Sequence, residues 1–212
     1  MTGPKKLMGG LVAVTAWAGL AIQLWLSLRI ASVNGKSFGS GLISYLGYFT
    51  ILTNLFVALA TTLPLAASVS GLGKWSARGA VYGCAVTAIT GVGISYHILL
   101  RNIWNPQGWQ WVADMTLHYA VPLLAVALWI LFPPKQSVSW KWPLLWCVYP
   151  AGYLVYALVR GALIHSYPYY FIDVPALGYG RVFIHATGLF VVFAVIGAMV
   201  TGIAAMRGRK KR

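Results

Sequence analysis

The sequence LISYLGYFTILTNLFVALATTLPLAA, residues 42–67, is an apolar run that contains no Asp, Glu, Lys or Arg. About 20 such residues in a helix span the hydrocarbon core of a bilayer, so the run predicts a transmembrane helix. Its segment YFTILTNL, residues 48–55, carries two threonine hydroxyls and an asparagine amide. Because the hydrocarbon region holds no water, Thr50, Thr53 and Asn54 must bond to their own backbone, to another helix, or to a bound molecule.

The rest of the chain has the same membrane-protein composition. The 212 residues are 59% hydrophobic and 8% charged, whereas a soluble domain carries about 25% charged residues. Five further apolar runs are long enough to cross a bilayer. The sequence therefore predicts an all-α integral membrane protein, a single domain over residues 1–212 with six transmembrane helices at about 8–29, 42–67, 78–100, 112–132, 143–165 and 181–205.

The distribution of basic residues predicts the orientation, because cytoplasmic ends of membrane helices carry the excess of Lys and Arg. Eleven of the 16 basic residues lie at one set of helix ends: Lys5, Lys6, Lys74, Arg78, Lys135, Lys141, Arg207, Arg209, Lys210, Lys211 and Arg212. The other five lie at the opposite ends: Arg29, Lys36, Arg101, Arg160 and Arg181. We therefore expect both termini in the cytoplasm and the protein in the plasma membrane, which is the inner membrane in a Gram-negative bacterium.

The net charge of +14 does not indicate a nucleic-acid partner. Nucleic-acid binding needs basic residues gathered on one folded surface, and here they fall between apolar runs. The expected partner is a membrane lipid.

Ionisable groups gather on the predicted outer side of the membrane. They are His97, His118, His165, His185, Asp114 and Asp173, together with Arg29, Arg101, Arg160 and Arg181. Ionisable groups are costly inside a membrane, so each is a candidate for a functional or paired role. Arg101 follows His97 by four residues, as His185 follows Arg181. Asp173 is expected to pair with Arg160 or Arg181 and so to hold the last outer loop.

His118, which shares a helix face with Asp114, is predicted to lie at the same depth in the membrane as Thr50 of the second helix. Asp114 and His118 are four residues apart, so one helix face can present a carboxylate that orients an imidazole. Thr50 lies about two turns below its outer boundary, which is roughly the depth of His118, and shares a face with Asn54. Pro122 cannot donate to the carbonyl of His118 and should kink that helix. The plainer alternative is that each threonine bonds back to the carbonyl four residues before it.

This combination of residues is suited to acyl transfer. A hydroxyl becomes a good nucleophile when a base takes its proton and a third group orients that base. Thr50, His118 and Asp114 fit these roles, and spacing alone leaves Thr53 as an alternative nucleophile. Asn54, Tyr48 or an arginine are candidates to stabilise the oxyanion. A site in the outer leaflet favours an ester with long apolar chains, and its hydrolysis requires no cofactor.

Two other classes of function compete with hydrolysis. Histidine is a common ligand of metals and haem, so an outer site built from His97, His118, His165 and His185 is one alternative. A lipid-binding protein or transporter is another, although the sequence contains no inverted repeat of the kind found in many transporters.

Three motifs resemble the androgen-induced protein family of multi-pass membrane proteins and its bacterial relatives. They are YFTILTN on the second helix, LHYAVP on the fourth, and YPYYFID followed by Gly-Arg in the last outer loop. Animal members hydrolyse fatty acid esters of hydroxy fatty acids with an intramembrane threonine nucleophile and a histidine. The resemblance implies that Thr50 is the nucleophile, with Thr53 as the alternative, and that His118 is its partner.

The chain departs from the animal members at two positions. Pro122 follows His118 by four residues, one fewer than in those proteins. Thr53 and Asn54 follow Thr50 where an animal member has an acidic residue. Both differences bear on the identity of the ester more than on the threonine–histidine pair. The remaining outer groups, namely His97, Arg101, Arg160, Asp173, Arg181 and His185, are candidates to bind a substrate headgroup or to support the structure.

Overall fold

The computed structural model describes residues 3–134 and 138–209, with side chains described up to Met206. In these ranges the chain is helical and has no strand. The elements are α1 Gly3–Val33, α2 Phe38–Leu46, α3 Phe49–Ala66, α4 Gly71–Ser76, α5 Gly79–Ser95, η1 Tyr96–Leu100, α6 Trp109–Met115, η2 Thr116–Ala120, α7 Val121–Leu131, α8 Trp142–Trp146, α9 Val148–Ile164, η3 Tyr170–Ile172 and α10 Val174–Arg209.

Six helical segments in the described ranges are long and apolar enough to cross a membrane, which confirms the predicted fold class. They are Gly3–Val33, Phe49–Ala66, Gly79–Leu100, Trp109–Leu131, Trp142–Ile164 and Val174–Met206. The first begins earlier than predicted, and α4 is a short helix that was not predicted. The last segment contains a kink at Gly178, whose backbone is not helical, so its long apolar part begins close to the predicted residue 181. Of the basic residues counted above, Lys135, Lys210, Lys211 and Arg212 lie outside the described residues, as do the side chains of Arg207 and Arg209.

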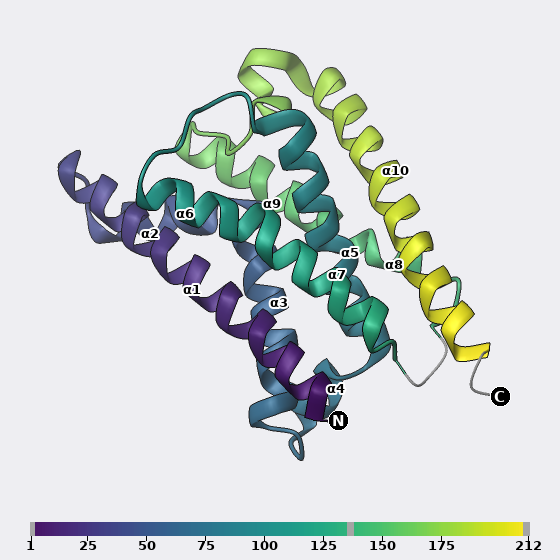
Figure 1. Ribbon diagram of the computed structural model, residues 1–212. Coiled ribbons are helices and arrows are strands. Elements are labelled where there is room, and N and C mark those ends of the chain that lie inside the picture. Colours follow the sequence, from purple (N-terminus) through teal and green to yellow (C-terminus); the bar gives the residue numbers. More distant parts are fainter. Residues whose placement is uncertain (1–2, 135–137, 210–212) are drawn as a thin grey trace.

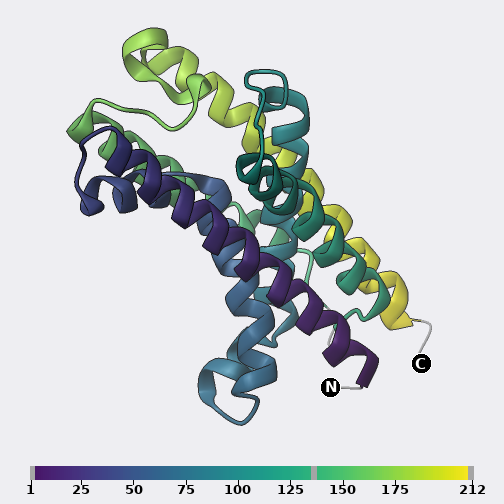
Figure 2. The same cartoon turned by 60° about the vertical axis from the view of Figure 1, so that its left-hand side comes forward.

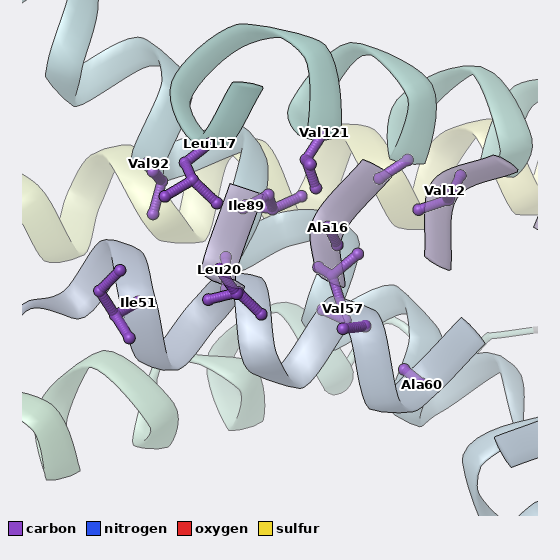
Figure 3. Close-up of a cluster of buried hydrophobic side chains, with 14 of the residues drawn as sticks. Val12, Ala16, Leu20, Ile51, Val57, Ala60, Ile89, Val92, Leu117 and Val121 are labelled. Atoms are coloured by element: carbon purple, nitrogen blue, oxygen red, sulfur yellow. The ribbon is translucent and has the colours of Figure 1, made fainter. Parts of the chain in front are cut away.

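The bundle packs around a core shared by α1, α3, α5 and α7. Helix α1 contacts α3 and α7, and α3 contacts α5, while α10 packs against α5 and α8 on the side of the bundle away from α1 (Figure 1). Figure 3 shows the core residues where these helices meet, among them Leu20, Ile51, Ile89 and Val121. These side chains are almost fully buried. The start of α1 and the end of α10 lie at the same end of the molecule (Figure 2).

The second predicted helix, 42–67, is divided near its start, so the prediction of one continuous helix was wrong. Helix α2 ends at Leu46, Gly47 follows as its cap, and Tyr48 adopts an extended conformation before α3 begins at Phe49. A break leaves carbonyl groups of the last turn without helical partners.

Side chains of α9 supply the missing partners at this break. Arg160 donates to the Ile43 carbonyl over 3.2 Å, Tyr156 to the carbonyl of Leu46 over 3.2 Å, and Tyr153 to the carbonyl of Gly47 over 2.9 Å. The donors lie more than 100 residues further along the chain. As a consequence, Thr50 lies in the first turn of α3 rather than two turns into a longer helix.

Two π-helical turns interrupt the helices that face Thr50. The first, η1, extends α5 over Tyr96–Leu100, and the second, η2, lies between α6 and α7 over Thr116–Ala120. Such turns widen a helix locally and are frequent at functional sites. The second turn directly precedes Val121 and Pro122, so the irregularity expected from this proline takes the form of a widened turn that contains His118.

Candidate functional site

Thr50 and His118 lie within hydrogen-bond distance of each other. The Oγ1 atom of Thr50 is 3.2 Å from Nε2 of His118. Thr50 is buried, with 8% of its surface exposed, and it cannot bond back along its own helix because α3 begins only one residue earlier. The carbonyl four residues before it, that of Leu46, accepts from Tyr156 instead. The Thr50 hydroxyl therefore has the imidazole as its side-chain partner.

Asp114 fixes the orientation of His118 from the preceding helical turn. Nδ1 of His118 lies 3.2 Å from the Asp114 carboxylate and 3.1 Å from the Asp114 carbonyl. Since both of these groups are acceptors, Nδ1 carries the ring proton, and Nε2 keeps a lone pair that can accept from Thr50. This arrangement of a hydroxyl, an imidazole and a carboxylate is the one that activates a nucleophile.

Tyr96, which sequence reasoning missed, completes the surroundings of Asp114 and His118. Its hydroxyl donates to the second carboxylate oxygen of Asp114. Its ring stacks on the His118 imidazole, with ring centres 3.9 Å apart and planes inclined by 14°. Asp114 and Tyr96 are both buried. No sequence motif marks Tyr96, because the π-turn at the end of α5 determines which side chain of that turn faces Asp114.

Asn54 has a structural role that excludes its side-chain N–H group from oxyanion binding. Its amide donates to the carbonyl of Thr50 over 2.8 Å and to the carbonyl of Leu117 over 3.2 Å. Both donor bonds are therefore used to join the first turn of α3 to η2. The suggestion that Asn54 supplies the oxyanion donor does not fit this geometry.

Tyr169 contacts the backbone of Thr50. It belongs to the loop between α9 and α10, and its hydroxyl oxygen accepts from the Thr50 backbone N–H over 3.4 Å. The hydroxyl keeps its own proton to donate. Burial raises the pKa of this hydroxyl above its ordinary value, so it is protonated at neutral pH. Tyr48, the other tyrosine suggested by the sequence, packs its ring edge-on against Tyr169 and is 44% exposed.

Two cavities meet at Thr50. The first, here called the α9 cavity, lies between α3, α5, α9 and α10. The second, the α1 cavity, lies between α1, α3, α6, η1 and η2. The residues common to both walls are Thr50, Tyr96, Leu100 and Tyr169. His118 and Asp114 line the α1 cavity.

Thr53, the alternative nucleophile, points elsewhere. Its hydroxyl lies 3.3 Å from the Tyr149 hydroxyl of α9, and its side chain is fully buried. Neither cavity wall includes it. The geometry separates the two threonines: Thr50 contacts the imidazole, and Thr53 contacts a tyrosine.

Asp173 does not pair with either arginine, so that prediction was wrong. Its carboxylate accepts from the Ala176 backbone N–H and caps the start of α10. Arg160 instead donates to the carbonyls of Ile43 and Ser166, and Arg181 is exposed. A short acceptor at a helix start satisfies the free backbone donors there, which explains the placement of Asp173.

His97 and His185 have partners outside the group formed by Thr50, His118 and Asp114. Arg101 donates to His97 over 2.9 Å, and His97 lies 3.1 Å from the Tyr119 hydroxyl, all at an exposed position. His185 bonds to the carbonyl of Phe171 rather than to Arg181. In the described part of the chain no three His, Cys, Asp or Glu side chains gather as metal ligands would, so the geometry does not favour the predicted four-histidine alternative.

Comparison of the chain with models of protein families, with curated proteins and with solved structures gives no match. The case for a function therefore depends on the side chains around Thr50 and on the two cavities that meet there.

Proposed function

We propose that this protein is an intramembrane hydrolase of long-chain lipid esters, a threonine-type carboxylic ester hydrolase. Thr50 is the nucleophile, His118 is the general base and acid, and Asp114 orients the imidazole. The observation that carries the proposal is the relay from Thr50 Oγ1 to His118 Nε2 and from His118 Nδ1 to Asp114, with both contacts at 3.2 Å. The resemblance to the androgen-induced protein family supports the same assignment of Thr50 and His118.

The reaction proceeds in two halves. Nε2 of His118 takes the proton of Thr50 as Oγ1 bonds to the ester carbonyl carbon. The resulting tetrahedral oxyanion collapses as His118 returns the proton to the leaving alcohol oxygen, and the acyl group remains on Thr50. Water then loses a proton to His118 as its oxygen bonds to the acyl carbon. The bond from that carbon to Thr50 Oγ1 breaks as His118 returns the proton to Oγ1, which releases the fatty acid and restores the Thr50 hydroxyl.

Tyr169 is the proposed donor to the oxyanion. Its hydroxyl is neutral and lies beside the Thr50 amide, close to where the carbonyl oxygen of a bound ester would be. The start of α3 adds a favourable field, because the N-terminus of a helix carries partial positive charge. Donors placed in advance at the developing charge give one of the largest contributions to this type of catalysis.

The two cavities support a substrate with apolar chains on both sides of the ester. Their walls are mostly hydrophobic side chains, and the nucleophile lies where they meet. The resemblance suggests esters of hydroxy fatty acids, which have this form. Such molecules reside in the membrane, so entry from the lipid would suit a site of this kind.

We propose that the site lies in the outer leaflet of the plasma membrane, with both termini in the cytoplasm. The distribution of Lys and Arg in the sequence supports this orientation, since eleven of the 16 lie at the ends predicted to be cytoplasmic.

Substitution of the relay tests the proposal. Thr50→Ala and His118→Ala should each lower the turnover of a long-chain ester by about a thousandfold or more, because each removes an essential part of the relay. Thr53→Ala is the matched control, since its hydroxyl contacts Tyr149, and it should retain turnover. Comparable turnover in the wild type, Thr50→Ala and His118→Ala would exclude the mechanism. A wild-type protein that binds lipid saturably without turning over any ester would instead be a lipid-binding protein.

A further inference from the structure

We infer that the ester binds in one direction, with its acyl chain in the α9 cavity and its alcohol in the α1 cavity. This inference rests on the proposed function, since it concerns the same site. It assigns each half of the substrate to a cavity and predicts that the alcohol carries a hydrogen-bonding group.

The position of His118 determines the direction. When the tetrahedral intermediate collapses, the leaving alcohol oxygen must receive a proton, and the donor must lie within about 3 Å of that oxygen. His118 lines the α1 cavity and is absent from the wall of the α9 cavity, whereas Thr50 lines both. The alcohol must therefore leave from the α1 side, and the acyl chain extends to the other.

The depth of the two cavities agrees with this direction. The wall of the α9 cavity reaches Gly91, Pro150 and Phe193, which lie along α5, α9 and α10 toward the end of the bundle that carries the termini. Gly91 precedes Tyr96 by five residues, or about 7 Å of helix. The wall of the α1 cavity instead reaches Ile103 and Trp104, in the loop at the opposite end. An acyl chain in the α9 cavity therefore points toward the middle of the span.

The polar groups of the two walls differ in the same sense. The α9 cavity is lined mainly by apolar and aromatic side chains, including Leu154 and Phe190. The α1 cavity contains Gln23 and Gln110, joined by one hydrogen bond of 3.0 Å from Gln110 to Gln23. That bond uses one donor and one acceptor, so the pair keeps both N–H and carbonyl capacity for a ligand. An alcohol that bears a hydroxyl, carboxyl or amide group would satisfy these groups, and a plain alkyl chain would not.

Two series of esters test the direction with purified full-length protein. In one series the acyl chain grows while the alcohol stays fixed. In the other the acyl chain stays fixed while the alcohol changes from alkyl to a hydroxyl-bearing chain of equal length. The value of kcat/KM is measured for every ester in the wild type and in the variants below.

Ala186→Phe should lower the maximum length of acyl chain that the protein hydrolyses. Ala186 is buried and lines the α9 cavity, so a phenyl ring there occupies space that a long chain needs. We expect kcat/KM for the longest acyl ester to fall by about tenfold or more relative to the shortest, while the preference among alcohols is unchanged. Leu154→Ala enlarges the same cavity and should shift the acyl preference toward longer chains, which keeps the test decisive if the phenylalanine variant does not fold.

Gln110→Leu should change the preference among esters that differ in their alcohol. It removes hydrogen-bonding groups from the α1 cavity at similar size, so the preference for the polar alcohol should fall by about tenfold with the acyl profile unchanged. Exchanged effects, in which the α9 variants alter the alcohol profile and Gln110→Leu alters the acyl profile, would overturn the assigned direction, as would unchanged profiles in folded variants. Absence of turnover of every ester by the wild type would instead refute the proposed function.

Discussion

The hydroxyl of Thr50 differs from those of Thr61 and Thr90 because of its place at the start of a helix. Thr61 and Thr90, which lie inside α3 and α5, donate to the carbonyl four residues before them. Such a bond uses the hydroxyl proton, so the hydroxyl cannot donate it to a base. Thr50 has no helical carbonyl within reach, so its hydroxyl is left to His118.

Tyr96→Phe should lower turnover without removing the relay. The substitution keeps the ring that stacks on His118 and removes the donor to Asp114. A hydrogen bond to a charged group contributes about 1.5–3 kcal/mol, so we expect kcat to fall by about 10- to 100-fold with KM little changed. Steady-state kinetics on a long-chain ester provides the measurement.

Tyr119→Phe is the matched control for Tyr96→Phe. Its hydroxyl contacts the exposed His97, and its ring packs edge-on against Tyr96. This variant should keep wild-type kcat. An equal loss in both variants would indicate general disturbance of the aromatic cluster, and wild-type kcat in Tyr96→Phe would contradict the role assigned to its hydroxyl.

Local spacing accounts for the part of the site that the sequence could predict. Asp114 and His118 lie four residues apart, so their contact depends on one stretch of helix and survives even the π-turn between α6 and α7. Tyr96 and Tyr169 come from other elements, and their contacts depend on how those elements pack. The spacing of residues within one helix does not show how that helix packs against others. These two side chains could therefore not be assigned to the site from the sequence.

At the scale of elements, the division between α2 and α3 determines where Thr50 lies. Hydropathy predicted the six spans because length and apolar content decide whether a segment can cross a bilayer. Hydropathy did not predict the division, because the carbonyl groups at the break accept hydrogen bonds from side chains of α9, namely Tyr153, Tyr156 and Arg160. The apolar run is continuous in sequence, and only its distant partners reveal the break.

Gly47→Ala should destabilise this division. A methyl group at residue 47 would lie 2.7 Å from the guanidinium carbon of Arg160, so the guanidinium must shift, and we expect this shift to weaken its bonds to the carbonyls of Ile43 and Ser166. Hydrogen bonds from a charged donor contribute about 1.5–3 kcal/mol each. We expect the midpoint of thermal unfolding in detergent to fall by several degrees and turnover to fall with it.

Gly39→Ala provides the control for this substitution. Gly39 belongs to the same short helix, and the nearest atom to its added methyl group would be 3.7 Å away, an ordinary contact distance. The midpoint should stay within about one degree of the wild type, since alanine also favours helix. Equal midpoints for Gly47→Ala and Gly39→Ala would show that Arg160 does not hold the break.

At the scale of the whole molecule, the proposed orientation places Val69 and Asn105 on opposite sides of the membrane. Val69 is exposed in the turn before α4, and Asn105 is exposed in the turn before α6. Each is changed to cysteine in a chain whose Cys84 and Cys147 are alanine, and intact cells are treated with an impermeant maleimide. We expect labelling at residue 105 and protection at residue 69; the reverse pattern would invert the topology.

The central claim, that Thr50 is the nucleophile of a lipid ester hydrolase, is tested most directly by locating a covalent adduct. The purified protein is treated with a long-chain fluorophosphonate, and its peptides are analysed by mass spectrometry. Because the hydroxyl of Thr50 contacts His118, whereas those of Thr53 and Thr61 have other partners, the adduct should lie on Thr50 and should be absent in His118→Ala. An adduct on Thr53 or another residue, or none on folded wild-type protein, would contradict the account.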